Sequence, residues 1–110
     1  MSFDPTYLHE KLCAARRSLM LPHPRGEEES LVSAMHECSL GLGSSARPED
    51  FDEHADGWVR TIQQTIDTTG LVALGDEGTF MVKARSMSDD DRMTFANAVD
   101  ELAFWTGDRS

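Results

Sequence analysis

The sequence has little cysteine, few cations and no long apolar run, and each shortage argues against a class of protein. Two Cys in 110 residues are too few for a disulfide framework. No uninterrupted apolar segment approaches the roughly 18 residues that a membrane-spanning helix needs, and residues 1–11 lack the basic start and apolar segment of a secretory signal. We therefore expect a cytoplasmic protein with free thiols and no membrane partner.

Anionic side chains outnumber cationic ones by two to one. Ten Lys and Arg stand against twenty Asp and Glu, which gives a formal net charge of −10. Binding to a phosphate backbone or to an anionic bilayer depends on cations, so the sequence predicts no direct nucleic-acid partner. A negative field of this size instead speeds encounters with basic proteins.

The chain does contain enough apolar residues for one small core. Its length and its 39% of hydrophobic residues predict a single globular domain over residues 1–110. Apolar residues recur at the helical period in four segments: 5–21, 27–42, 48–69 and 88–105. Gly70 is expected as the C-cap of the third helix. Ser88 and Asp91 form a variant of the capping box at the start of the last.

The apolar period changes between residues 71 and 85. A short apolar run, 71–74, is followed by a Gly-bounded turn and then by the alternation of Phe80, Val82 and Ala84. This pattern predicts a β-hairpin. The expected fold class is therefore α+β and mostly helical, with three helices, a two-stranded β-hairpin and a C-terminal helix around one core. The predicted interior comprises Leu8, Leu12, Leu19, Leu31, Met35, Phe51, Trp58, Ile62, Ile66, Phe80, Val82, Val99 and Leu102.

An isolated hairpin would leave two edges with unpaired backbone groups. Proteins usually cover or blunt such edges, and pairing across a two-fold axis would cover them. We therefore expect a homodimer, with the hairpin or the Phe104–Trp105 end of the last helix in the interface.

Three groups of residues resemble parts of a metal site, but none of them makes a complete set of ligands. His36 and Cys38 are two residues apart on a helix and point to opposite sides, which predicts an exposed imidazole and a buried thiol. His9 and Cys13 share a face, but nothing obliges a third ligand to come near them. The alternating carboxylates of residues 50–57 lack the glycine and the closing Glu of a calcium loop. No metal and no cofactor are expected.

Catalytic motifs are not found either. Cys38 with His23 is the one nucleophile and base pair that can be assembled for covalent catalysis, and no nucleophile elbow accompanies it. The glycines of residues 41–45 lack the lysine and the strand of a phosphate-binding loop. We therefore do not expect an enzyme.

Two surface segments are candidates for binding. Two prolines stiffen residues 22–26, so His23 and Arg25 would project at low entropic cost. Alternatively, the prolines only turn the chain between two helices. The second candidate is the acidic run 49–56, whose acids could recognise a partner or could simply form a solvated helix start. Its binding residues would be Glu49, Asp52, Glu53 and Asp56.

The sequence thus predicts a non-catalytic interaction or regulatory protein that binds a basic macromolecule through an acidic surface. Such a protein could act as an inhibitor that masks a basic surface, by presenting carboxylates where phosphates would sit. The alternative is a small-ligand-binding domain with an apolar pocket between helices. Methionines would give that pocket adaptable walls, although interior methionines more often serve packing alone. These residues are Met20, Met35, Met81, Met87 and Met93.

Overall fold

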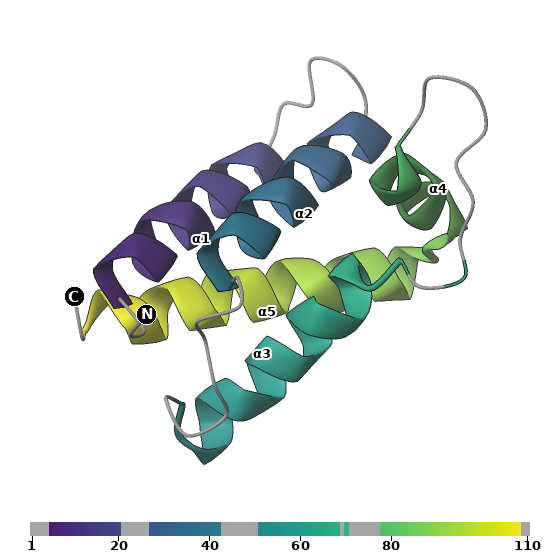
Figure 1. Cartoon of the computed structure of the whole chain (residues 1–110). Coiled ribbons are helices and arrows are strands. Elements are labelled where there is room, and N and C mark those ends of the chain that lie inside the picture. The colour runs from purple at the N-terminus through teal and green to yellow at the C-terminus, as the bar shows by residue number, and fades with distance from the viewer. Residues whose placement is uncertain (1–4, 21–26, 43–50, 69, 71–77, 109–110) are drawn as a thin grey trace.

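The computed structural model describes five helices (Figure 1). Residues 5–20, 27–42, 51–68, 70 and 78–108 are described, without the side chains of Pro5 and Glu27. The helices are α1 (Pro5–Leu19), α2 (Glu27–Leu42), α3 (Glu53–Ile66), α4 (Thr79–Ser86) and α5 (Asp89–Gly107).

Helix α5 lies at the centre of the arrangement. The antiparallel pair α1 and α2 runs along one side, and α1 packs on α5, so that the start of α1 lies beside the end of α5 (Figure 1). Helix α3 packs on α5 from another side, and the short α4 packs mainly on α2. Both α2 and α4 also touch α3, which closes the bundle.

The core confirms most of the predicted interior. Of the residues predicted to be inside, the buried ones are Leu8, Leu12, Leu31, Met35, Phe51, Ile62, Val99 and Leu102. The others are only half-buried: Leu19, Trp58, Ile66, Phe80 and Val82. Further large side chains outside that predicted list are buried as well: Leu42, Val59, Met87, Phe95 and Trp105.

Two helix ends follow from local hydrogen bonds. The capping box at α5 is confirmed: Asp91 N–H donates to Ser88 Oγ over 3.1 Å, and Ser88 N–H donates to the Asp91 carboxylate over 3.2 Å. Helix α3 is shorter than predicted, because it runs from Glu53 to Ile66 and its C-cap is Asp67 instead of Gly70. Asp and Thr are weak helix formers, which explains an end before residues 67–69.

The predicted β-hairpin is wrong. Its second strand is α4, and no strand occurs within residues 5–20, 27–42, 51–68, 70 and 78–108. The first strand, 71–74, and the turn lie outside the described residues. The alternation covered only seven residues, in which Phe80 and Ala84 are also one helical turn apart. Met, Lys, Ala and Arg in this segment favour a helix, and Ala84 is its buried residue.

The correction changes the fold class and removes the hairpin edge from which a homodimer was expected. The described residues are all helical and not α+β, so they offer no hairpin edge for a second copy to cover. At the other suggested interface, Trp105 is buried and Phe104 is exposed. As to membranes, none of the helices in the described ranges combines the length and hydropathy needed for a span.

Candidate functional site

Some carboxylates of the acidic run 49–56 stabilise the fold. Asp52 is the N-cap of α3, and its Oδ1 accepts a hydrogen bond from Ala55 N–H over 2.8 Å. Its Oδ2 accepts a hydrogen bond from Trp105 Nε1 over 2.9 Å. The ring of Trp105 also meets that of Phe51, with centroids 5.7 Å apart. The carboxylate of Asp52 therefore fastens the start of α3 to α5.

The other predicted binding residues divide into two groups. Asp56 is half-buried and lies 2.9 Å from Arg60 Nε, one turn along α3, so its charge is largely balanced on its own helix. Glu53 is exposed in the first turn of α3. His23, Arg25 and Glu49 lie outside the described residues. Among the predicted binding residues that the structure describes, Glu53 is thus the one whose carboxylate is not engaged by another side chain.

A larger acidic surface lies on α5. We call it the outer face of α5. It extends from one end of the helix to the other, and each of its side chains is exposed. Their spacing of three and four residues places them on one side of the helix. The members are Asp89, Asp90, Met93, Thr94, Asn97, Asp100, Glu101, Phe104 and the C-cap residue Asp108.

Two apolar side chains stand among these carboxylates. Phe104 is 72% exposed and Met93 is 65% exposed. They are eleven residues apart in sequence, which is three turns and about 16 Å along the helix. Apolar side chains this exposed gain free energy when a partner covers them, so their position among acids is typical of a binding surface.

Helix stability explains only part of this acidity. Asp89, Asp90 and Asp91 occupy the first turn of α5, where the positive end of the helix dipole stabilises them. Asp108 stands at the opposite end, where a carboxylate meets the negative end of the dipole, and the last turn holds no basic residue. Asp108 therefore reduces helix stability, and Glu101, in the second half of the helix, lies beyond the reach of the favourable end.

Within the part of the chain that the structure describes, cations do little to neutralise the outer face. Arg92 is the only cation between residues 89 and 108, and it turns inward, where its Nη2 donates to the Ala84 carbonyl over 3.1 Å. Arg16 of α1 reaches Asp100 at one edge over 3.5 Å. Both of these side chains are exposed, so solvent screens the pair and it contributes little.

The outer face was only partly visible in the sequence. The sequence predicts the cap formed by Ser88 and Asp91, but it places the acidic binding surface at residues 49–56 and not on the last helix. The three-turn spacing of Met93 and Phe104 was the signal that could have revealed the face, since both fall opposite the buried stripe of the same helix.

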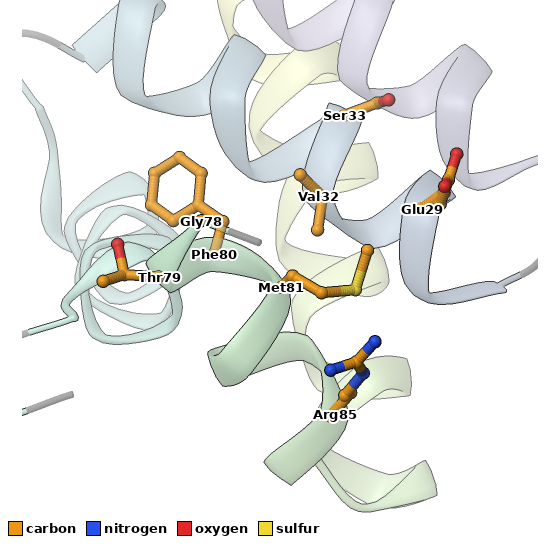
Figure 2. A pocket seen from close by; sticks show the side chains of 8 residues that line it. All are labelled: Glu29, Val32, Ser33, Gly78, Thr79, Phe80, Met81 and Arg85. Carbon is orange, nitrogen blue, oxygen red and sulfur yellow. The ribbon is translucent and has the colours of Figure 1, made fainter. Parts of the chain in front are cut away.

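A second candidate site is a cavity between α2 and α4, with a volume of about 650 Å³ (Figure 2). This is within the usual size range of small-molecule sites. Val32, Phe80 and Met81 supply apolar walls. Glu29 from α2 and Arg85 from α4 lie above and below the end of Met81, so the cavity has both signs of charge at its rim (Figure 2).

The described His and Cys residues follow the predicted geometry. His36 is exposed and Cys38 is buried, so these two neighbours do point apart. Burial, with a smaller contribution from Glu37, raises the pKa of Cys38 to about 12, which makes this thiol a poor nucleophile. In the described segments, no three His, Cys, Asp or Glu residues come together as a metal site.

No known family, no curated protein and no solved structure matches this chain.

Proposed function

We propose that the protein is a non-catalytic binding module that uses the outer face of α5 to hold a basic, partly apolar segment of another protein. The observation that supports this is the arrangement of that face, in which five carboxylates surround two strongly exposed apolar side chains. Carboxylates steer and orient a basic partner, and burial of Phe104 and Met93 supplies affinity.

The expected partner has Lys or Arg on either side of apolar side chains. An amphipathic basic helix meets this description, because it can bring apolar residues to Phe104 and Met93 while its cations reach the acids around them. By covering such a segment the protein would act as an inhibitor or a regulator. We place this activity in the cytoplasm, where Cys13 and Cys38 would stay reduced as the free thiols they are.

A second copy of this chain is a poorer occupant of the face. Symmetric pairing through the outer face would bring the carboxylates of both copies together, and like charges in contact are costly. The proposal therefore replaces the homodimer expected from the hairpin by a complex with a different protein. Light scattering should give a monomer mass of 12.2 kDa for the protein alone.

The test is the affinity for a synthetic helical peptide of lysine and leucine, measured by fluorescence anisotropy. Phe104→Ser should weaken binding by about tenfold or more, because the apolar anchor is lost. Glu101→Gln combined with Asp108→Asn should weaken binding and reduce its salt dependence. Both carboxylates flank Phe104 in the sequence, and neither forms an ion pair with another described residue.

A charge-matched double variant serves as control. Glu10→Gln with Glu53→Gln removes the same amount of charge from exposed positions outside the outer face. It should leave the affinity within about twofold of the unmodified protein. The proposal fails if this control weakens binding as much as the α5 variants do, or if Phe104→Ser binds as tightly as the original chain.

The cavity between α2 and α4 supports a second candidate function, the binding of a small molecule with an apolar body and polar ends. Its volume and its mixed rim favour this reading. Ser33→Trp would place an indole at the cavity, and Ser86→Trp, at the far end of α4, is its control. If the cavity binds an apolar fluorescent dye, Ser33→Trp should abolish that binding and Ser86→Trp should not.

A further inference from the structure

A thiol and an imidazole meet at the contact between α1 and α5. Cys13 and His9 are one turn apart on α1, and Cys13 Sγ lies 3.5 Å from His9 Nε2. This is hydrogen-bonding distance for sulfur. The pair lies against the last turns of α5, where the start of α1 and the end of α5 run side by side (Figure 1).

The surroundings of His9 fix which of its nitrogens carries a proton. Nδ1 lies 3.0 Å from the Ala103 carbonyl oxygen, which can only accept, so Nδ1 carries a hydrogen and donates it. Thr106 Oγ1 also lies 3.0 Å from Nδ1, and its hydroxyl donates to the same carbonyl. Cys13 Sγ lies 3.5 Å from Nε2 and 3.9 Å from Nδ1, so the sulfur lies beside the ring and closer to Nε2, the nitrogen that carries no hydrogen in the neutral ring.

Close packing holds the imidazole in this position. Thr106 is fully buried beneath it. A Cβ added to Gly107 would lie 3.1 Å from His9 Cε1, so a side chain there would press on the imidazole ring. The result is a thiol, a base within reach of its proton, and a third group that orients the base, which is the arrangement that activates a nucleophile.

The second cysteine provides an internal comparison. Cys38 is fully enclosed in the core, and its exposed neighbour His36 points away from it. Cys13 is only half-buried, so a small reagent can reach it. Reactive thiols are partly exposed and lie beside a group that can take the proton, whereas buried structural thiols are inert.

We propose that Cys13, with His9 as its base, is a modification site at which the protein forms a mixed disulfide with a low-molecular-weight disulfide. Cys13 sulfur attacks one sulfur of the disulfide, the new sulfur–sulfur bond forms, and the old one breaks. His9 Nε2 takes the thiol proton and returns it to the departing thiolate, which leaves as a thiol. The step consumes one disulfide and releases one thiol, with no other oxidant.

This site is separate from the proposed binding surface. Ala103 and Thr106 belong to the buried side of α5, whereas Phe104 belongs to its outer face. The inference therefore stands or falls independently of the peptide experiment. His9 and Cys13 do not form a metal site, because within the described ranges no third ligand lies near them.

The test is the rate of thiol release from the neutral reagent dithiodipyridine, with the adduct located by mass spectrometry. The folded protein should release one equivalent rapidly and carry the adduct on Cys13. Cys38→Ala should retain this phase, and Cys13→Ser should lose it. A folded protein in which Cys13 does not react, or in which Cys38 reacts first, would overturn the proposal.

The role of His9 is tested on the Cys38→Ala background. Asn at position 9 retains a donor for the Ala103 carbonyl but lacks the distal nitrogen, so His9→Asn should slow the reaction by about tenfold or more. His9→Ala should be slow as well and should regain speed when free imidazole is added. Gly107→Ala, which displaces the ring, should also slow the reaction.

Thermal melting of each variant shows that it is folded. A merely structural role for His9 predicts no rescue by imidazole. Unchanged rates in His9→Asn, or a His9→Ala variant that imidazole does not accelerate, would contradict the assignment of His9 as the base. Because the reagent is uncharged, the net charge of −10 should not affect its rate of reaction with the variants.

Discussion

Asp52 shows how one side chain can hold two elements together. One carboxylate oxygen caps α3 and the other accepts the indole N–H of Trp105 on α5. An N-cap is worth about 1 kcal/mol, and a hydrogen bond to a charged acceptor about 1.5–3 kcal/mol. Asp52, which was predicted as a binding residue, thus stabilises the fold. The residue spacing in the sequence could not show this, because Trp105 is 53 residues away.

Substitution at Asp52 separates the two tasks. Asp52→Ala removes both acceptors and should lower the free energy of unfolding by about 2–3 kcal/mol. Asp52→Asn retains one acceptor oxygen and should cost about half as much. Urea denaturation measures both values, with Glu53→Gln as the control that should change stability by less than about 0.5 kcal/mol. Equal stability of Asp52→Ala and the unmodified chain would refute the tie to Trp105.

Because the thiol of Cys38 is buried, we expect the free energy of unfolding to fall at alkaline pH. Burial raises its pKa from 9.0 to about 12 in the folded protein. Below pH 9 the thiol is protonated in both states, so it adds no pH dependence. Between pH 9 and 12 the unfolded chain loses the proton and the folded one keeps it, so stability falls as pH rises, by about 1.4 kcal/mol per pH unit.

The Cys38→Ala variant isolates this effect from the other groups that titrate at high pH. Its free energy of unfolding should fall less steeply over that window than that of the original chain. The stability difference between the two proteins should therefore shrink or reverse as pH rises, as followed by urea denaturation. Parallel curves up to pH 12 would show that Cys38 is not sealed from solvent.

At the scale of elements, α1 and α2 approach each other closely at Gly41. A Cβ on Gly41 would lie 2.9 Å from the Cβ of Lys11 and 3.0 Å from Leu8 Cδ1, so the two helices touch there because residue 41 has no side chain. Lys11 also pairs with Glu37 of α2 over 3.7 Å, and its stem is fixed by this contact.

Gly41→Ala should therefore destabilise the protein even though alanine is the better helix former. Overpacking costs about 1–3 kcal/mol, against a gain of about 0.5–1 kcal/mol in helix propensity. Gly57 of α3 is the matched control, since nothing lies within 4 Å of its added Cβ. Gly57→Ala should raise the melting temperature and Gly41→Ala should lower it. Two changes of the same sign would contradict the close approach of α1 and α2.

Helix α5 offers a test in which stability and binding change in opposite directions. Asp108 stands at the negative end of the helix dipole. Asp108→Lys should raise the free energy of unfolding by about 0.3–1 kcal/mol and weaken binding of the basic helical peptide. Thermal melting and anisotropy measure the two effects on one sample. A fall in both the free energy of unfolding and the affinity would contradict the unfavourable position of Asp108 at the end of the helix.

The elements also show which sequence signals were sufficient. The starts of α1, α2 and α5 could be predicted because caps and prolines act within one turn. Helix α4 could not, because seven residues of alternating hydrophobicity fit both periods and the deciding factor is its packing on α2. Likewise, Phe80 and Val82 were placed in the interior for a strand, and as helical residues they are only half-buried.

At the scale of the whole molecule, the net charge favours the basic partner that we propose but does not point to a particular surface. The value of −10 is a property of composition, whereas the outer face of α5 exists only because Phe95, Val99 and Leu102 turn the other side of the helix inward. Acids predicted to bind, such as Asp52 and Asp56, proved to be engaged within the fold. The contact between His9 and α5 likewise joins residues more than ninety positions apart.

The most direct test of the proposed function is a map of backbone amide shifts by NMR during titration with the lysine and leucine peptide. Binding at the outer face of α5 should shift the amides of Met93, Asn97, Glu101 and Phe104 most strongly. Amides beside the cavity of Val32 and Met81, and the amide of Glu53, should move little. Shifts concentrated around that cavity or around Glu53, with α5 unchanged, would contradict the account.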